Sequence, residues 1–458
     1  MKGGPPINRE IFRKYDIRGV YPEDLSAEVT IALGRVLGEM AGEHALIGRD
    51  CRESGRMLME WLAAGMTESG CRVGDLGVQT TPMTYYAAHS LKPGLTVMIT
   101  GSHNPPEYNG FKIMKGLETI YGQSITEIGN RMEGVLTSGT PVGPPRLEQL
   151  SVRQSYMDRL LGEFSLGRSL KVVVDAGNGT GCDPAVEVLE RLGCRVVPLY
   201  CSMDGSFPNH HPDPTVEENL RDLKSSVVRE KADIGIAFDG DADRLGVVDD
   251  RGETVWGDRI LMLLAGHLLR TNPGATVISE VKASRLLFEQ VKTAGGRPFM
   301  SPTGHSLIKK AMVEQNALLA GEMSGHIFFR DRYYGYDDAL YAALRVLEIL
   351  GSDDRPLHSH FKDLPEVFST PEIREDCSDS SKFAIVDRVV ELLQDDGYGV
   401  NTTDGARIDF KDGWGLVRAS NTQPVLVLRF EAGTPEALAD YERTTRDYIS
   451  RARRDLHV

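Results

Sequence analysis

The sequence contains few cysteines and no long apolar run. Its 458 residues include six cysteines at scattered positions, with no CxxC pair and no Cys/His spacing that suits zinc. In a chain of this length such cysteines predict reduced, mostly buried thiols. The apolar run 260–266 ends at His267, whereas a membrane span needs about 20 apolar residues. Residues 1–10 also lack the apolar segment of a secretory signal, so we expect a cytoplasmic protein with no membrane partner.

Positive charge is also scarce, because 52 Lys+Arg stand against 66 Asp+Glu, which gives a formal net charge of −14. Such a surface repels nucleic acid and no basic stripe offsets it, so we expect no nucleic-acid partner. A site for an anionic ligand would need several cationic side chains close together to offset the negative field of the protein. With 41% hydrophobic and 26% charged residues, the composition excludes disorder and is typical of a globular protein. The length alone suggests about three domains.

Short β-branched runs alternate with helical patterns through most of the chain, which predicts parallel sheets with crossover helices. The predicted strands include 45–48, 72–76, 95–100, 171–175, 234–238 and 276–281, and the predicted helices include 26–40, 56–69 and 337–350. The Gly/Pro-rich stretch 138–145 marks a candidate domain boundary. The last part differs, because closely spaced strands up to 426–432 and a charged helix from Pro435 onward predict a smaller α+β domain.

Three aspartates follow the apolar strand 234–238 within one short loop. Asp239, Asp241 and Asp243 are separated only by single small residues, so the three carboxylates can converge. Packed carboxylates repel one another unless a cation neutralises them, and Mg²⁺ or Ca²⁺ would do so with oxygen ligands. The loop is too short for an EF-hand. A solvated acidic turn is the alternative, but three Asp directly after a buried strand favour a metal site.

The segment TGSHNPPEYNGFK (100–112) places Ser102 in a turn directly after another buried strand. A serine in such a turn is presented as a nucleophile or phosphate carrier needs to be. His103 could move a proton, and Lys112 could neutralise a phosphate. Most serines in turns only bond their own backbone, and that interpretation stays open for this segment taken alone. No GxSxG elbow is present, so serine hydrolase chemistry has no support.

Two further polar loops carry side chains that suit ligands. RASNTQP (418–424) combines an arginine with hydroxyl and amide groups, as a phosphate clamp requires. GEMSGH (321–326) offers donors and acceptors for sugar hydroxyls. Taken alone, RASNTQP could equally be a polar turn, and GEMSGH is a weak signal because a Glu or His on a turn is usually only solvated. AGNGTG (176–181) matches neither GxGxxG nor GxxxxGK[ST], which favours a tight strand–helix turn over a nucleotide loop.

Five segments occur in the order seen in one enzyme family. They are FRKYDIRG (12–19), TGSHNPPEYNGFK, DGDADR (239–244), GEMSGH and RASNTQP. Together they make the chain resemble the α-D-phosphohexomutase superfamily, and within it the bacterial phosphomannomutase/phosphoglucomutase branch. The resemblance covers essentially the whole chain. One departure is Ala242, where the metal loop commonly has glycine, but the three aspartates are kept.

The resemblance implies an α/β fold of four domains around a central cleft, in place of the three domains that length suggests. Three domains would share an α/β core with a mixed sheet, and the C-terminal domain would be a smaller α+β unit. The boundaries that we expect are 1–150 with the phosphoserine loop, 151–253 with the metal-binding loop, 254–366 with the sugar-recognition loop and 367–458 with the phosphate-binding loop.

The resemblance also implies roles for the motif residues. The catalytic residues would be Ser102 as phosphate carrier, His103, Lys112, Arg244 and His326, with Lys112 and His326 as proton shuttles. Mg²⁺ would be held by the Ser102 phosphate, Asp239, Asp241 and Asp243. The sugar would be bound by Glu322, Ser324, His305 and Lys282, and the non-reacting phosphate by Arg418, Ser420, Asn421 and Thr422. Tyr15 and Arg18 would line the cleft.

The implied reaction is reversible phosphoryl transfer between O1 and O6 of mannose and glucose phosphates. It would proceed through the phosphoserine and a hexose 1,6-bisphosphate, which acts as intermediate and activator. Met323 stands where the phosphoglucosamine branch usually has Gln, which favours mannose and glucose. The alternatives are a phosphoglucosamine mutase, a Mg-dependent sugar phosphatase and a non-catalytic sugar-phosphate-binding protein. We expect hexose phosphates as partners, and a monomer or weak homo-oligomer.

Overall fold

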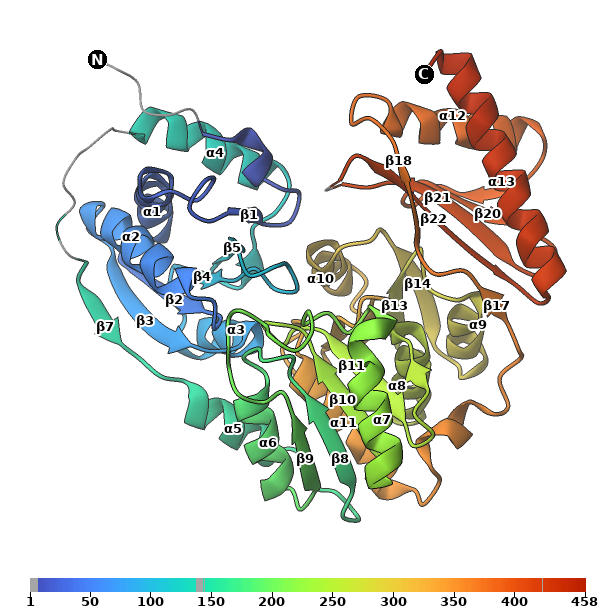
Figure 1. The fold of residues 1–458 in the computed structure, drawn as a ribbon, viewed down its shortest axis with the longest axis horizontal. Helices are drawn as coiled ribbons and strands as arrows, with labels where there is room; N and C mark the ends of the chain where they lie inside the picture. Colours follow the sequence, from blue (N-terminus) through green and yellow to red (C-terminus); the bar gives the residue numbers. More distant parts are fainter. Residues whose placement is uncertain (1–6, 137–142, 144, 422) are drawn as a thin grey trace. The chain divides into compact units, whose positions relative to one another are not determined.

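The computed structural model describes residues 7–136, 143, 145–421 and 423–458 (Figure 1). The chain divides into two compact units. The first unit takes in residues up to 260 together with 324–360, and the second takes in 261–323 together with 361–458. Among the described residues, no helix combines the length and apolar character needed to cross a bilayer.

The first unit contains two sheets, of which the first has the strand order β1-β5-β4-β2-β3-β7, with β6 paired to β5. Its strands are β1 Ile17–Val20, β2 His44–Arg49, β3 Arg72–Val78, β4 Leu95–Ile99, β5 Tyr108–Lys115, β6 Glu118–Thr119 and β7 Leu147–Gln149. Its helices are η1 Arg9–Ile11, α1 Ala27–Ala41, α2 Ser54–Glu68, α3 Thr81–Leu91 and α4 Gln123–Val135. One apolar core joins α1, α2 and α4 to a face of this sheet.

Local sequence explains how these elements form and pack. Ser26 caps α1 by accepting a hydrogen bond from the Val29 amide, which satisfies one of the donors left open at a helix start. The helices α1 and α2 approach closely at Gly34 and Gly65, where a β-carbon would overlap the carbonyl oxygen of the facing helix. The strand β4 is buried along its whole length, as its unbroken apolar run predicts.

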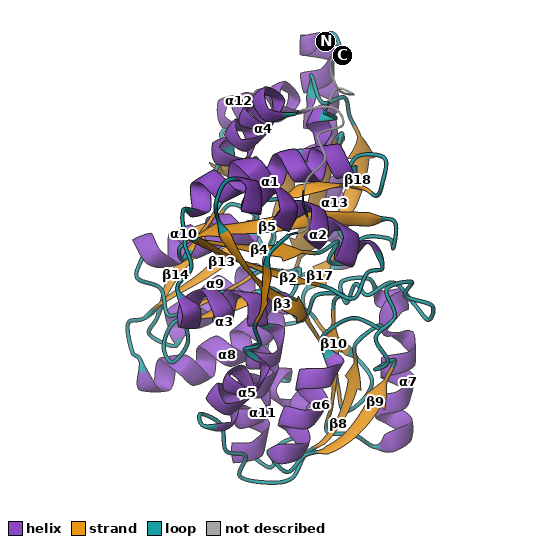
Figure 2. Cartoon of the chain, turned by 90° about the vertical axis from the view of Figure 1, so that its left-hand side faces the viewer, coloured by secondary structure: helices purple, strands orange, loops and turns teal. Residues whose placement is uncertain are grey.

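The second sheet of the first unit has the order β12-β11-β10-β8-β9. Its strands are β8 Lys171–Asp175, β9 Arg195–Leu199, β10 Ile234–Phe238, β11 Leu245–Asp249 and β12 Thr254–Val255. The other elements of the unit are α5 Arg153–Leu161, α6 Cys182–Arg191, η2 Glu217–Leu220, α7 Arg221–Glu230, β16 Ile327–Phe329, α11 Ala339–Ser352 and η3 Leu357–Phe361. The helices α6 and α7 lie alongside β8–β10 (Figure 2).

Both sheets are mixed, as the family resemblance implies, whereas the alternating pattern alone predicts parallel strands. The strand β5 runs antiparallel to β1 and β4, and β11 runs antiparallel to β10. The connections explain the difference, because β4–β5 and β10–β11 are joined by short loops that carry no helix. A short loop reverses the chain, whereas a parallel neighbour needs a long crossover.

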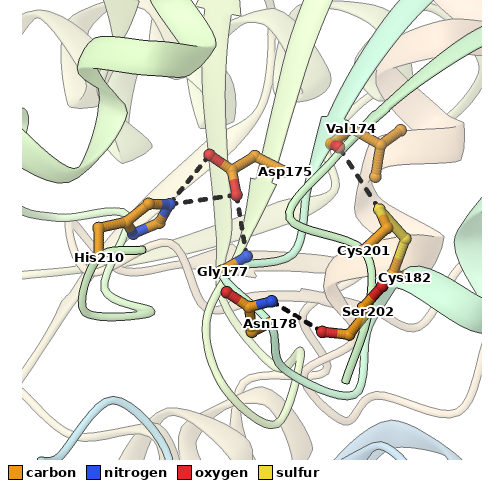
Figure 3. Close-up of a disulfide and its surroundings, with 8 residues drawn as sticks. All are labelled: Val174, Asp175, Gly177, Asn178, Cys182, Cys201, Ser202 and His210. Carbon is orange, nitrogen blue, oxygen red and sulfur yellow. Dashed lines mark hydrogen bonds and ion pairs between the residues drawn. A yellow bond between two sulfur atoms is a disulfide. The ribbon is translucent and has the colours of Figure 1, made fainter. Parts of the chain in front are cut away.

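A disulfide joins Cys182, the first residue of α6, to Cys201, just after β9 (Figure 3). The expectation that all six cysteines are reduced is therefore wrong for this pair, while the other four are free thiols. The βαβ topology explains the pairing. Since β8 and β9 are parallel neighbours, the start of α6 and the end of β9 meet at the same edge of the sheet, and the two Cα atoms lie 5.2 Å apart.

Reduction of this disulfide is expected to destabilise the second sheet of the first unit. The two cysteines are 19 residues apart, and closing a loop of that size stabilises a fold by about 3 kcal/mol. Urea unfolding with and without a dithiol reductant measures the effect, and a Cys182→Ala/Cys201→Ala variant should match the reduced protein in both conditions. Cys194→Ala, which removes the buried free thiol just before β9, should keep its response to the reductant. An unchanged urea midpoint on reduction would contradict the stabilising role.

The second unit contains a three-stranded parallel arrangement and a separate antiparallel sheet. The parallel strands lie in the order β14-β13-β15, and the antiparallel sheet has the order β17-β22-β21-β20-β19, with β18 also paired to β22. Its strands are β13 Thr276–Glu280, β14 Arg297–Ser301, β15 Leu319–Gly321, β17 Phe368–Ser369, β18 Ile373–Asp376, β19 Gly399–Asn401, β20 Ala406–Asp409, β21 Trp414–Ala419 and β22 Val425–Ala432. Its helices are α9 Arg285–Thr293, α10 His305–Glu314, α12 Lys382–Asp395 and α13 Pro435–Leu456, and α8 Gly257–Thr271 runs into it from the first unit.

The C-terminal sheet confirms the predicted α+β part of the chain. The helices α12 and α13 pack on one face of the sheet, over β20–β22 (Figure 1). The helix α13 begins as predicted at Pro435, with Thr434 as its cap. Proline suits the first turn of a helix because it lacks only an amide that would have no partner there.

Candidate active site

The three aspartates converge in the loop between β10 and β11. Asp239, Asp241 and Asp243 are fully buried, and Asp239 accepts hydrogen bonds from the Asp243 and Arg244 amides at 3.1 and 3.2 Å. Burial, together with the charges of the other two aspartates, raises the pKa of Asp239 well above its usual value. Ala242 adopts a positive φ of 59°, which explains why glycine is usual there, since an L-residue is strained in that region.

Lys112 lies at the centre of this cluster. It is on β5 and not in the loop before that strand, and its ammonium group lies 2.6 Å from Asp241 Oδ2 and 2.5 Å from Asp243 Oδ2. Burial alone would lower the pKa of Lys112, but the charges of Asp241 and Asp243 raise it well above its usual value. Burial alone would likewise raise the pKa of Asp243. The charges of Lys112 and His326 outweigh burial and hold this pKa well below its usual value. Thr81, at the start of α3, also donates to Asp241 Oδ2 at 2.5 Å.

Ser102 brings the first sheet to this cluster. The serine follows β4, has a positive φ of 50° and is 2% exposed. Its hydroxyl donates to Asp239 Oδ2 at 2.8 Å and lies 3.2 Å from Nδ1 of His103. The strained turn therefore aims the serine hydroxyl at the aspartates, as the predicted phosphate carrier and metal site require.

Sequence reasoning missed the residues that hold the Ser102 loop. The buried Arg52 donates to the backbone carbonyls of Ser102, Asn104 and Pro105 at 2.6 to 2.8 Å. Asp50 pairs with the Arg52 Nε at 3.1 Å and accepts from the Thr100 hydroxyl and the Gly101 amide. The sequence signal was an Asp-x-Arg directly after the apolar strand β2. A charged pair can remain buried there because its groups are hydrogen-bonded.

The glycine-rich turn 176–181 supports the metal-binding loop and matches the predicted strand–helix turn. The amide and the hydroxyl of Thr180 both donate to the Gly240 carbonyl, at 3.0 and 3.1 Å. A β-carbon at Gly179 would crowd Gly240. The asparagine of the turn, Asn178, is held by the segment that follows β9, since its amide side chain donates to the Ser202 carbonyl (Figure 3).

His326 also joins the acidic cluster. Its Nε2 lies 3.2 Å from Asp243 Oδ1 and 3.4 Å from the Nε of Arg244, while its Nδ1 lies 3.1 Å from the Ser324 hydroxyl. The half-buried His103 has a pKa well below its usual value, because desolvation and the charges of Arg244 and Arg18 disfavour its protonated form. These predicted catalytic residues therefore gather around Ser102.

The two predicted cleft residues sit at the start of β1. Arg18 pairs with Asp16 at 2.6 Å, and its charge reaches the ring of His103. Next to Tyr15, the Lys14 ammonium group lies 5.7 Å from the centre of the tyrosine ring. Arg18 is thus linked electrostatically to the Ser102 loop.

The second unit holds the remaining predicted residues. At the end of β13, Glu280 is fully buried and accepts hydrogen bonds from the Thr303 hydroxyl at 2.6 Å and the Met323 amide at 3.0 Å. The Lys282 ammonium lies 3.6 Å from Glu280 and 3.1 Å from Glu372. Burial alone would lower the pKa of Lys282, but these carboxylates raise it.

Two strand-end loops of the second unit meet at the predicted sugar-binding residues. Glu322 is 3% exposed and accepts a hydrogen bond from the Gly304 amide at 2.8 Å. His305 is the first residue of α10 and follows that glycine. Ser324 belongs to the first unit. The structure therefore brings Glu322 and the turn before His305 together.

The predicted phosphate loop follows β21. Arg418 is 6% exposed, and its Nε donates to Asp404 Oδ2 at 2.9 Å. The Ser420 hydroxyl accepts from the Gln423 amide at 3.1 Å, and Asn421 is the next residue of the loop. Thr422 lies outside the described residues.

The aspartate cluster fits a hard divalent cation. One oxygen from each of the three aspartates lies within 4.8 Å of the others. Asp241 Oδ1 is buried and has no hydrogen-bond partner among the described residues. A buried carboxylate oxygen without a donor is costly unless a cation meets it, and a set of carboxylate oxygens suits Mg²⁺.

Comparisons with known proteins identify the family of the chain. Four family models match in order, namely phosphoglucomutase/phosphomannomutase alpha/beta/alpha domain I over residues 9–134, domain II over 154–252 and domain III over 256–368, and the C-terminal domain over 372–447. The chain is 47% identical to a Pseudomonas aeruginosa phosphomannomutase/phosphoglucomutase, covering 99% of this chain and 98% of the relative. It is 44% identical to a Neisseria gonorrhoeae phosphoglucomutase, covering 94% and 95%.

A solved structure gives the same result. A phosphoglucomutase/phosphomannomutase family protein from Burkholderia thailandensis matches with a TM-score of 0.91 at 42% identity, covering 98% of both chains. The predicted four-domain α/β architecture and the predicted enzyme class, a hexose phosphate mutase, are confirmed. The chain belongs to the phosphoglucomutase/phosphomannomutase family.

Proposed function

We propose that the chain interconverts the 1- and 6-phosphates of mannose and of glucose, with Ser102 as the phosphate carrier. The observation that carries this proposal is the 2.8 Å contact between the Ser102 hydroxyl and Asp239, inside a buried cluster of three aspartates. Phosphoryl transfer depends mainly on positioning and on neutralising charge. This cluster provides a fixed hydroxyl, a place for a cation and the ammonium group of Lys112.

In this proposal Asp239, Asp241 and Asp243 hold Mg²⁺. The ion would act as a Lewis acid on the transferring phosphoryl group. Phosphorylated Ser102 donates its phosphoryl group to the free hydroxyl of a hexose phosphate, which gives a 1,6-bisphosphate, and the serine then recovers the other phosphate. A hexose 1,6-bisphosphate is therefore both the intermediate and the activator.

Different side chains around Ser102 would accept and donate the protons that move during phosphoryl transfer. His103, whose pKa is well below its usual value, is neutral near pH 7, so it can accept a proton through the ring nitrogen that faces the serine hydroxyl. Lys112 stays protonated while it pairs with the aspartates and can donate. His326 and Arg244, within 3.4 Å of each other, complete the proposed catalytic set.

The remaining predicted residues would bind the rest of the substrate. Arg418, Ser420, Asn421 and Thr422 grip the phosphate that does not react, and Glu322, Ser324, His305 and Lys282 bind the sugar. Tyr15 and Arg18 line the path of the substrate. The proposed domain boundaries are 1–150, 151–253, 254–366 and 367–458. We also propose a monomer or weak homo-oligomer in the cytoplasm, where the Cys182–Cys201 disulfide would be exposed to reduction.

Phosphorus NMR on an equal mixture of mannose, glucose and glucosamine 1-phosphates tests this function. With Mg²⁺ and a trace of glucose 1,6-bisphosphate, mannose and glucose 6-phosphates are expected to appear together while glucosamine 6-phosphate lags. Faster conversion of the glucosamine compound would make the chain a phosphoglucosamine mutase. Growth of inorganic phosphate alone would make it a phosphatase, and binding without conversion would make it a sugar-phosphate-binding protein.

A further inference from the structure

Asp404 lies in the turn between β19 and β20 and holds the guanidinium group of Arg418. Asp404 Oδ2 accepts from the Arg418 Nε at 2.9 Å, and the two side chains are 16% and 7% exposed. A carboxylate on Nε leaves the two terminal nitrogens of an arginine as the donors for a phosphate, and two such donors bind a phosphate in a fixed geometry. In this pair the arginine is therefore held in an orientation that suits phosphate binding.

The backbone is built for this close contact. Gly405, directly after the aspartate, has a positive φ of 88°. A β-carbon at Gly405 would overlap the carbonyl oxygen of Val417 and the β-carbon of Arg418. Only glycine lets the turn lie against β21 in this way, so the backbone brings Asp404 close to the arginine.

The same aspartate reaches the loop before α10. The Thr303 amide donates to Asp404 Oδ2 at 3.0 Å, and the Thr303 hydroxyl donates to Glu280 at 2.6 Å. The next amide along the chain, that of Gly304, donates to Glu322 at 2.8 Å. One carboxylate oxygen thus links the proposed phosphate clamp to the turn that carries the proposed sugar-binding residues.

We propose that Asp404 is a positioning residue, which orients Arg418 for the non-reacting phosphate and ties the clamp to the 303–305 turn. This inference rests on the proposed role of Arg418 in binding that phosphate. Asp404 does not touch the reacting atoms in this proposal. Its loss should therefore weaken substrate binding and leave the chemical step at Ser102 largely intact.

Steady-state kinetics on mannose 1-phosphate with Asp404→Ala, Arg418→Ala and the double variant tests the inference. Since an arginine side chain that nothing holds must lose rotamer entropy when it binds the phosphate, we expect Asp404→Ala to raise KM about tenfold with kcat changed less than threefold. In the Arg418→Ala background, the second substitution should change KM by less than twofold, because Asp404 acts through that arginine. Asp396→Ala, which removes the partner of Arg451 on α13, is the matched control and should behave as wild type.

Two results would overturn the inference while the proposed function stands. One is that the double variant raises KM by the product of the two single effects, which would mean that the two residues act independently. The other is a lower KM in Asp404→Ala, which would mean that the carboxylate competes with the phosphate for the arginine. An unchanged KM in Arg418→Ala would instead remove the proposed clamp itself, and the inference with it.

A more conservative variant guards against a misfolded protein. Asp404→Asn keeps the shape of the side chain and an oxygen that can accept from Arg418 and Thr303, but it removes the charge. We expect its KM to lie between those of wild type and Asp404→Ala, at a wild-type melting temperature. If the KM of Asp404→Asn were as high as that of Asp404→Ala, the negative charge of Asp404 alone would explain the effect. That result would overturn the proposal that Asp404 orients Arg418.

Discussion

The Ser102→Ala variant is expected to lose turnover of mannose and glucose 1-phosphates by about 10⁴-fold or more, as removal of a nucleophile does in other enzymes. The alanine has no oxygen to carry the phosphate between substrate molecules. The Asp239 carboxylate loses one donor but keeps the amides of Asp243 and Arg244, so the loop should remain folded. Initial rates with Mg²⁺ and glucose 1,6-bisphosphate measure the loss.

The variant should still bind substrate, because the proposed clamp at Arg418 is on other strands. Calorimetric titration with glucose 1-phosphate should give an affinity close to that of wild type, and phosphorus NMR should show no phosphoserine signal. Ser54→Ala is a matched control, since this serine contacts Asn109 at 2.8 Å in the same unit and has no role in transfer. Turnover of Ser102→Ala within tenfold of wild type would refute the assignment of the carrier.

The placement of Ser102 and the aspartates could be predicted from the sequence because the signals are local. An unbroken apolar run such as 95–99 makes a buried strand, and the polar residues after it must lie at the sheet edge. The order of the five loops then pointed to the family, and the family resemblance implied a role for each loop. The predicted helices and strands match the observed bounds to within a few residues, for example 26–40 against Ala27–Ala41.

What the sequence could not predict depends on contacts between distant residues. Lys112 was expected to meet a phosphate, and it pairs with Asp241, 129 positions away, because β5 returns antiparallel beside β4. The helix α3 was missed because TPMTYYAAHSL is rich in β-branched and aromatic residues of modest helix propensity. Its burial and the cap at Thr80 outweigh that propensity, and the helix start then brings a threonine hydroxyl to Asp241.

The supporting residues were missed for the same reason. Arg52, paired with Asp50, holds a loop 50 residues further along the chain, and Asp404 holds an arginine 14 residues away. Neither pair has a periodic pattern, and an aspartate near a turn is common in any protein. The Cys182–Cys201 pair likewise depends on which strands are neighbours, and spacing alone does not determine that.

Removal of divalent cations is expected to lower turnover by about a thousandfold, since a metal that neutralises a transferring phosphoryl group contributes several kcal/mol to its transition state. The structure gives the reason at Asp241. One of its oxygens pairs with Lys112, whereas the other is buried without a donor among the described residues. The lysine therefore neutralises only part of the cluster, and a second cation is needed when a phosphate arrives.

Chelation followed by Mg²⁺ titration measures this dependence, and thermal unfolding gives a readout that does not need activity. A ligand that binds only the folded state stabilises it by about 2.7 kcal/mol at 100 times its Kd, so Mg²⁺ should raise the melting temperature of the apoprotein. Asp241→Asn should abolish both the activity and the shift. Asp249→Asn, at a buried aspartate that accepts from the Arg251 and Glu253 amides after β11, should keep both. Full turnover in excess chelator would exclude the metal from the reaction, and a Mg²⁺-induced shift that survives in Asp241→Asn would place the ion elsewhere in the protein.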